Sequence, residues 1–295
     1  MNGWDFSILW QAGRAVLAGG NPYSSGYFYY PLPFAYGTAI LALLPERLSF
    51  WLWIAANLLI LIVVFRRSFW HWIFFLPILH MLSSGNVDLL FWVMARGLGR
   101  HWRGAVLGAL ITLKPQVALL LLPWHLLDWL RSDRLTLGRW AVITTLLWAT
   151  PLLWRPSWIA EWTEATPDLS WLTASNSPGL FGSLKVWPFL AIPLALVAVA
   201  LFAWGIRQRD EIARACALLA SPVGMFYQTM ALLDCAPAAV LVPISLLAAV
   251  VSLASGTFIP FMLLPLAVIA WHMSRARRGP EGSVPSNPER RGTVA

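Results

Sequence analysis

The sequence predicts an all-α, polytopic integral membrane protein. Of its 295 residues, 59% are hydrophobic and only 12% are charged, and the mean hydropathy is positive. Soluble domains carry about a quarter of charged residues, so this balance places the chain in a lipid bilayer. The 19 tryptophans agree with this prediction, because many stand at the ends of apolar runs, where amphipathic rings are stabilised at the membrane interface.

The first 49 residues are expected to form a loop outside the membrane core that begins with an amphipathic helix. From Asp5 to Leu17, apolar residues recur at the spacing of one helical stripe, and Gly19 with Gly20 supplies a stop. This pattern is typical of a helix that lies at a membrane interface. The N-terminus lacks a basic n-region and an apolar h-region, so no cleavable signal peptide is expected.

The rest of this loop is aromatic and rich in proline. An Asn-Pro pair at residues 21–22 predicts a turn, and the Tyr- and Pro-rich run at residues 27–33 suits the depth of the lipid headgroups. Residues 33–44 are expected to take a shallow or re-entrant path, because a full crossing would place the N-terminal acid in the cytoplasm. We therefore expect juxtamembrane helices within residues 1–49.

Ten apolar runs follow and predict about ten membrane segments from residue 50 to residue 273. Several are shorter than the roughly 20 residues of an ordinary span, and short helices at membrane depth are tolerated where protein shields them or where they line a water-filled cavity. The middle of the chain is therefore expected to enclose such a cavity. The runs are approximately 50–65, 69–82, 86–95, 104–113, 115–130, 138–154, 186–206, 212–228, 235–252 and 257–273.

The positions of the arginines predict the orientation. Ten arginines fall in four short loops, which the positive-inside rule places in the cytoplasm. They are Arg66, Arg67, Arg96, Arg100, Arg103, Arg131, Arg134, Arg139, Arg207 and Arg209. The first loop, residues 83–88, Lys114 and residues 155–185 then share the extracytoplasmic side.

Residues 1–274 are expected to form a single transmembrane domain, and residues 275–295 a disordered basic tail. Ten crossings would leave this tail outside the cytoplasm, against the positive-inside rule. Either one late run does not cross, or the tail is an exception.

Lys114 stands within the apolar stretch 109–118 and is followed by Pro115. A lysine within a span costs about 2.5–3.5 kcal/mol on insertion scales, so its ammonium is expected to have a partner, which the proline helps it to reach. An outer-leaflet lipid phosphate is a suitable partner, because ammonium is a compact charge that binds phosphate well. The alternative is a lysine that snorkels to the interface without a specific ligand.

Residues 83–88, Ser-Ser-Gly-Asn-Val-Asp, form a polar turn between two apolar runs. On the predicted topology this turn lines the same cavity as Asp5 and Lys114. Asn86 is a candidate to bind a sugar or phosphate oxygen, and Asp88 to pair with Lys114 or to bind a sugar hydroxyl. The alternative is that the turn serves only as an Asx-type cap for the next helix.

A similar polar break occurs at residues 221–228. Tyr227 and Gln228 are candidates to add polar contacts to the cavity. The alternative is that the Ser-Pro pair at residues 221–222 only kinks a helix.

Several other kinds of site are not predicted. The histidines show no metal-ligand spacing, and neither a Gly-rich phosphate loop nor a nucleophile elbow is present, so we expect no metal, cofactor or nucleotide donor. The net charge of +8 is explained by the loop arginines and requires no nucleic-acid partner. The acids Glu161, Glu164 and Asp168 are expected to be solvated charges.

The order of short motifs resembles that of glycosyltransferase family 87, the polyprenyl-phosphate-mannose-dependent mannosyltransferases with the GT-C fold. The motifs are Asp5 before an amphipathic helix, Gly-Asn-Pro-Tyr at 20–23, Tyr-Tyr-Pro-Leu-Pro at 29–33, Ser-Gly-Asn-Val-Asp-Leu-Leu at 84–90, Leu-Lys-Pro-Gln at 113–116 and Ser-Pro before Tyr at 221–227. The resemblance runs from Asp5 to about Leu130 and more loosely to Pro243. It implies a GT-C-like helical bundle with an extracytoplasmic active site and no obligatory metal.

The resemblance also implies roles for individual residues. Asp5 would be the general base that takes the proton of the acceptor hydroxyl, and Lys114 would stabilise the leaving phosphate. Tyr29 and Tyr30 would hold the sugar or the lipid head, and Arg14 would assist at the phosphate. The full substrate-binding set expected is Lys114, Arg14, Tyr29, Tyr30, Asn86, Asp88, Gln116 and Tyr227.

The function expected from the resemblance is transfer of a hexose, most simply mannose, from a polyprenyl-phosphate donor to a lipid or glycan acceptor, with inversion. The enzyme would be an integral protein of the bacterial plasma membrane, with its site facing outward. The chain departs from the family at Gly85-Asn86, where Gly-Gln is common, and at its start, where only residues 1–4 precede Asp5. The alternative is therefore a non-catalytic flippase or carrier of lipid-linked sugars, or a degenerate member that lacks the first transmembrane helix.

Overall fold

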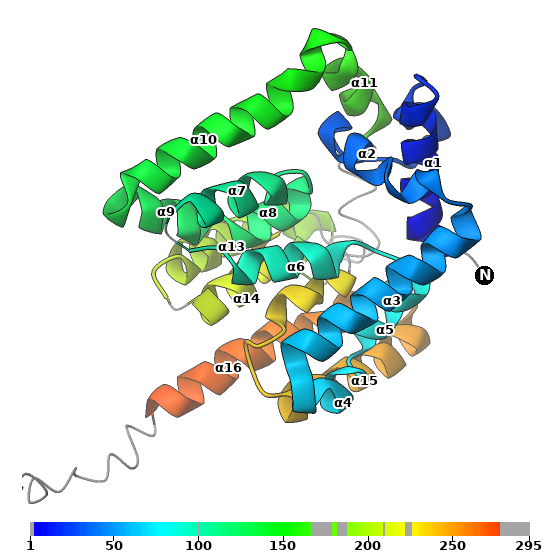
Figure 1. The fold of residues 1–295 in the computed structure, drawn as a ribbon. Coiled ribbons are helices and arrows are strands. Elements are labelled where there is room, and N and C mark those ends of the chain that lie inside the picture. The colour runs from blue at the N-terminus through cyan, green and yellow to red at the C-terminus, as the bar shows by residue number, and fades with distance from the viewer. Residues whose placement is uncertain are drawn as a thin grey trace, which may run out of the picture.

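The structure is a computed structural model that describes residues 3–99, 101–166, 179–181, 188–208, 210–221 and 226–277. Within these ranges the chain forms helices and turns but no strands (Figure 1). Three helical segments are long and apolar enough to cross a membrane: Glu46–Trp72, Ala238–Ser255 and Ile259–Ala276. The predicted all-α membrane protein is confirmed, while the number of crossings stays a prediction.

The helices match most of the predicted apolar runs. The first half contains α1 (Trp4–Leu17), α2 (Leu32–Thr38), α3 (Glu46–Phe65), α4 (Phe69–Trp72), α5 (Leu76–Ser84), α6 (Asp88–Arg96), α7 (His101–Ile111), α8 (Pro115–Leu121), α9 (Pro123–Ser132) and α10 (Arg134–Ala149). The second half contains α11 (Trp158–Ala165), α13 (Ala191–Gly205), α14 (Asp210–Ala220), α15 (Ala238–Ser255) and α16 (Leu263–Arg277). Prolines near the first positions of α5, α8 and α9 explain several of the breaks, because proline suits a helix start but not its interior.

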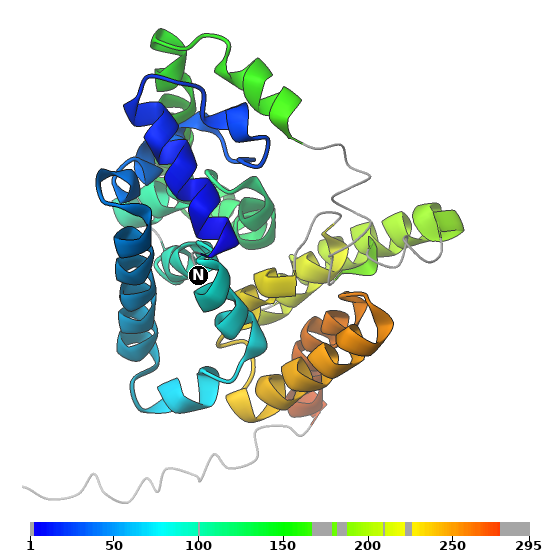
Figure 2. The same cartoon turned by 90° about the vertical axis from the view of Figure 1, so that its right-hand side faces the viewer.

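The first loop packs as a unit at one end of the molecule. Figures 1 and 2 both place α1, α2 and α11 at this end, with α4, α15 and α16 at the other. Helix α1 ends before Gly19 and buries Phe6 and Leu9, as its apolar stripe predicts. Instead of a spanning helix, residues 33–44 contain most of α2 and the 3₁₀ helix η2 (Leu41–Leu43).

The C-terminal boundary differs from the prediction. Helix α16 continues to Arg277, so residues 275–277, which were expected in the disordered tail, are helical. The apolar run of this helix extends its hydrogen-bonded turns into the basic segment. The remainder of the predicted tail lies outside the described residues.

Gly85 marks the place where α1 crosses the end of α5. Its φ of +74° is a left-handed conformation that disfavours residues with a Cβ. A Cβ built there would lie 2.5 Å from the Cβ of Phe6 and 3.2 Å from the ring of Phe50, and the Gly85 carbonyl accepts a 3.1 Å hydrogen bond from Trp53 Nε1. Close backbone approach therefore sets the position of α1, and with it Asp5.

Replacing Gly85 with Ala is expected to lower the free energy of unfolding by roughly 2–4 kcal/mol, because backbone strain and overpacking act together. Gly26→Ala is the matched control, since Gly26 has a φ of +71° but a Cβ there meets no atom within 4 Å. Thermal unfolding of the purified variants in detergent measures both effects. Equal losses for the two variants would show that strain alone is responsible and that close approach of α1 adds nothing.

Candidate active site

The Lys114 ammonium lies inside the protein and is paired. Only 3% of the residue is exposed, and Nζ forms an ion pair with Oδ1 of Asp88. Nζ also donates to Oδ1 of Asn86 at 3.3 Å. The structure thus confirms that Lys114 has a partner. The alternative, a lysine that snorkels to the interface, is wrong, because the ammonium is buried.

Asn86 links this ion pair to the first loop. Its amide nitrogen Nδ2 donates to Oδ2 of Asp5 at 3.0 Å, while its Oδ1 accepts from the backbone N–H of Asp88 at 3.0 Å. The contact with Asp88 is an Asx-type turn at the start of α6, so this turn and the predicted pairing of Asp88 with Lys114 occur together. Asp5, in the first turn of α1, is thereby connected through one amide to Lys114.

Two tyrosine rings flank the Lys114 ammonium. The centroid of the Tyr30 ring lies 5.6 Å from Nζ and that of the Tyr227 ring 5.7 Å away, within the range of cation–π attraction. Burial raises the pKa of Tyr30 above its ordinary value, so the ring beside the ammonium carries a neutral phenol. Residues 222–225, where a kink was the alternative, lie outside the described residues.

His80 is a neighbour of this cluster that the sequence analysis did not assign to it. Its ring stacks on Tyr227 with centroids 5.5 Å apart and planes 10° apart. The only sequence signal was its position three residues before the polar turn 83–88. The imidazole therefore supports the ring that covers Lys114.

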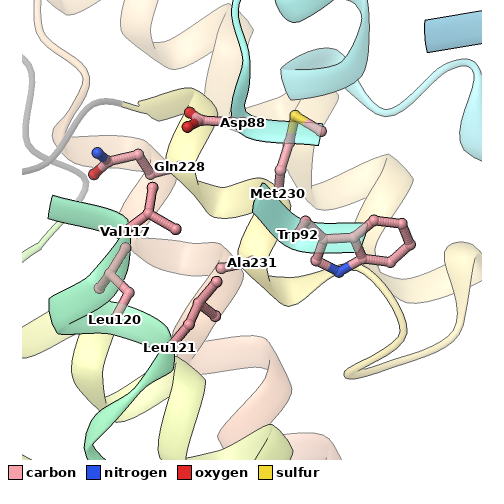
Figure 3. Close-up of a pocket in the computed structure, with 8 residues that line it drawn as sticks. All are labelled: Asp88, Trp92, Val117, Leu120, Leu121, Gln228, Met230 and Ala231. Atoms are coloured by element: carbon pink, nitrogen blue, oxygen red, sulfur yellow. The ribbon is translucent and has the colours of Figure 1, made fainter. Parts of the chain in front are cut away.

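A small cavity of about 10 Å³, roughly the room that one water molecule needs, lies beside Asp88. Figure 3 shows Asp88 and Gln228 at one end and the indole of Trp92 alongside. Its lining residues are Asp88, Trp92, Val117, Leu120, Leu121, Gln228, Met230 and Ala231. Oδ1 of Asp88 binds Lys114, while Oδ2 is buried and has no hydrogen-bond partner among the described residues.

The remaining predicted site residues are placed differently. Arg14 is exposed, and its guanidinium lies 5.7 Å from the centroid of the Trp10 ring. It stands nine residues after Asp5 on the same helix, which corresponds to about 13 Å along the helix axis. The structure therefore does not bring Arg14 to the cluster. Gln116 is half-buried in the first turn of α8, and its Oε1 has no hydrogen-bond partner among the described residues. Tyr29 is half-buried, and its carbonyl accepts a 2.9 Å hydrogen bond from Trp162 Nε1.

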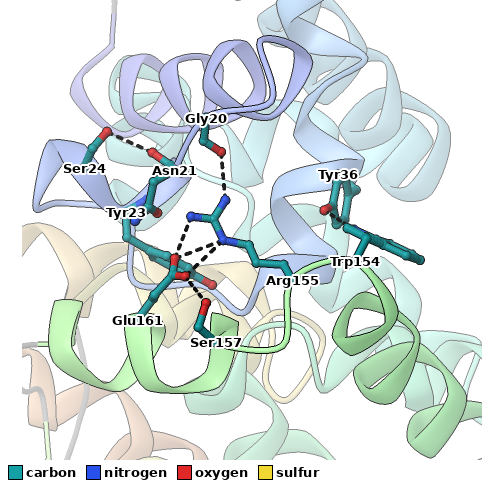
Figure 4. A network of polar contacts seen from close by, with 9 residues as sticks. All are labelled: Gly20, Asn21, Tyr23, Ser24, Tyr36, Trp154, Arg155, Ser157 and Glu161. Atoms are coloured by element: carbon teal, nitrogen blue, oxygen red, sulfur yellow. Dashed lines mark hydrogen bonds and ion pairs between the residues drawn. The ribbon is translucent and has the colours of Figure 1, made fainter.

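Arg155, just before α11, forms an ion pair with Glu161 and a hydrogen bond to the first loop. Arg155 donates to Glu161 from Nε and from Nη2, at 3.0 and 2.6 Å to Oε2, and from Nη1 to the carbonyl of Gly20 at 2.9 Å (Figure 4). Ser157 also donates to Glu161, at 2.5 Å. The expectation that Glu161 is a solvated charge is wrong, since its side chain is only 22% exposed. Asp168 lies outside the described residues.

Replacing Arg155 with Ala is expected to destabilise the first loop by roughly 1–2 kcal/mol, because it removes charge-assisted hydrogen bonds that are partly screened by solvent. Arg155 lowers the pKa of Glu161, so this stabilisation is present at neutral pH and is lost as the pH falls through that lowered value. Hydrogen exchange at residues 20–23 measures the effect. Arg47→Ala, at an exposed arginine of α3, is the control, and equal exchange in the two variants would contradict the prediction.

One comparison with known proteins found a family match. The family model described as Glycosyltransferase family 87 matches residues 28–233, which is more than half of the chain. The matched region contains Tyr30, Asn86, Lys114 and Tyr227 and begins after Asp5. No curated protein and no solved structure matches the chain.

Proposed function

Because the chain belongs to glycosyltransferase family 87, we propose that this membrane glycosyltransferase transfers a hexose from a polyprenyl-phosphate donor to a lipid or glycan acceptor. The sugar we propose is mannose. The donor, the acceptor and the side of the membrane go beyond what family membership establishes. They are supported by the motifs of the sequence and by the chemistry of the buried cluster.

The observation that carries the proposal is the connection between Asp5 and Lys114 through the Asn86 amide. It places a carboxylate and an ammonium on either side of one side chain. An ammonium has three N–H donors, and among the described residues Asp88 and Asn86 accept two of them. The Tyr30 side chain also hydrogen-bonds to Lys114, so a phosphate oxygen of the donor would take the place of one of these partners.

The reaction we propose is a single displacement. Asp5 takes the proton of the acceptor hydroxyl as that oxygen forms a bond to the anomeric carbon. The bond from this carbon to the phosphate oxygen breaks, and its electron pair leaves with the polyprenyl phosphate. Lys114 stabilises the added charge, an interaction that is strong where little water is present. A single attack inverts the anomeric configuration.

The distribution of arginines supports an extracytoplasmic site in a plasma membrane such as that of bacteria. Arginine-rich loops are retained in the cytoplasm, which leaves the first loop on the opposite side. No nucleotide would be needed there, because the phosphate of the donor belongs to a lipid. Tyr29 and Tyr30 are proposed to contact the sugar or the lipid head.

The test is an assay with purified protein in lipid nanodiscs, a membrane lipid extract as acceptor and one of three donors: polyprenyl-phosphate mannose, polyprenyl-phosphate glucose or a mannose nucleotide. We expect a new mannosyl lipid or glycan of inverted configuration from the first donor alone. Transfer from the nucleotide would contradict the proposal. Binding or translocation of the lipid-linked sugar without a new glycosidic bond would instead support a carrier.

A further inference from the structure

The amide of Asn86 is buried and uses both of its ends. The residue is 2% exposed. Its oxygen accepts from Lys114 Nζ at 3.3 Å and from the backbone N–H of Asp88 at 3.0 Å, and its nitrogen donates to Asp5 at 3.0 Å. No other described side chain is hydrogen-bonded to both Asp5 and Lys114.

These partners fix the orientation of the amide. Lys114 Nζ and a backbone N–H can only donate, and an ionised carboxylate can only accept. Rotating the amide by 180° would place its NH₂ against two donors and its oxygen against the Asp5 carboxylate. The nitrogen of Asn86 must therefore face Asp5. The amide cannot rotate away from this carboxylate without losing its hydrogen bonds to Lys114 and to the N–H of Asp88.

We infer that Asn86 is a positioning residue that holds the Asp5 carboxylate for proton abstraction, and that it does not bind the sugar or the phosphate. This inference rests on the proposed function, in which Asp5 is the base. The amide fixes Oδ2 of Asp5 and so leaves Oδ1 as the oxygen that takes the proton of the acceptor hydroxyl. Through its hydrogen bonds to Lys114 and Asp88, Asn86 also connects this ion pair to the first loop.

Two variants separate the two ends of the amide. Asn86→Asp keeps an oxygen for Lys114 and for the N–H of Asp88, but it places a second carboxylate oxygen against Asp5. Asn86→Ala removes both ends. If the role of Asn86 is to hold Asp5, both variants lose activity. If its role is only to hold Lys114, the aspartate variant keeps its activity.

The experiment measures kcat and donor KM for both variants, each in the wild-type chain and in the Asp5→Asn background, with polyprenyl-phosphate mannose. We expect kcat to fall roughly 10- to 100-fold in the wild-type chain, as for loss of a hydrogen bond to a charged group, with donor KM little changed. In the Asp5→Asn background we expect no further loss, because residues that act as a unit are not additive.

Folding is followed separately with the exchanged pair Asp5→Asn/Asn86→Asp. This double variant re-forms the hydrogen bond with donor and acceptor reversed. We expect it to regain the Tm that Asn86→Asp alone loses, while its turnover stays at the level of Asp5→Asn. Failure to regain the Tm would overturn the inference, because the bond between residues 5 and 86 would then not be what the aspartate variant breaks.

Other outcomes separate this inference from the proposed function. Three results would overturn the positioning role while leaving Asp5 as the base. They are a wild-type kcat for Asn86→Asp, an equal loss of kcat in both backgrounds, and a raised KM with an unchanged kcat. Wild-type turnover by Asp5→Asn alone would overturn the base, and with it the role of Asn86.

Discussion

The Asp5→Asn variant is expected to lose about 10²- to 10⁴-fold in kcat, which is the usual contribution of a well-placed general base. The substitution keeps the size of the side chain and removes its capacity to accept a proton. Asp5 is not fully buried and its neighbour Asn86 is neutral, so the change leaves no unpaired buried charge. We therefore expect the variant to fold and to bind the donor as the wild type does. Initial rates of mannosyl transfer at saturating donor measure the loss.

The matched control for this variant is Asp128→Asn, which makes the same chemical change at an exposed acid of α9. It is expected to keep wild-type turnover. Turnover by Asp5→Asn within about two-fold of this control would refute the assigned base, because a general base contributes far more than that. A loss shared by both variants would indicate a general effect of charge instead.

Lys114→Met is expected to abolish transfer and to lower the free energy of unfolding by about 3–5 kcal/mol, because it leaves the Asp88 carboxylate buried without its counterion. Methionine matches the length of the lysine stem, so packing between the Tyr30 and Tyr227 rings is largely kept. Chemical denaturation and initial rates of mannosyl transfer give the two measurements.

A double variant separates stability from function at this pair. In Lys114→Met/Asp88→Leu both charges are replaced by apolar groups, and such replacements of buried pairs are often neutral or stabilising. We expect the double variant to regain much of the lost stability but no transfer, because the phosphate still lacks its cation. Wild-type transfer by the double variant would show that the pair has only a structural role.

Much of the fold follows from local sequence patterns. The apolar runs predict the helices, and prolines at residues 77, 115 and 123 explain where long runs are divided. The partner of Lys114 is also predictable, since a lone ammonium in an apolar segment is costly and the nearest polar turn contains an acid.

The contacts between distant segments are not predictable in this way. Asn86 lies 81 residues from Asp5, and the pair forms because α1 closes over the backbone at Gly85. Arg155 lies 135 residues from Gly20 in sequence, so nothing local indicates that its guanidinium donates to the first loop. In both cases tertiary packing brings together groups that are far apart in the sequence and that no local motif connects.

Arg14 is a residue that the sequence places at the site but the structure does not. Its charge and its place in the first loop favour a role at the phosphate, but the helical period carries it to the exposed face, over Trp10. The apolar stripe of α1 is what decides the direction in which each residue points. Asp5 reaches the cluster because it stands in the first turn, beside the crossing with α5.

The most direct test of Asp5 as the base is the fate of donor already bound to the protein. Wild-type and Asp5→Asn proteins are loaded with radiolabelled polyprenyl-phosphate mannose, acceptor is added, and product is followed over a single turnover. We predict that both proteins bind the donor equally, that the wild type converts it to inverted product and that Asp5→Asn retains it unconverted. Conversion by Asp5→Asn at the wild-type rate would contradict the proposed role of the Asp5–Asn86–Lys114 cluster.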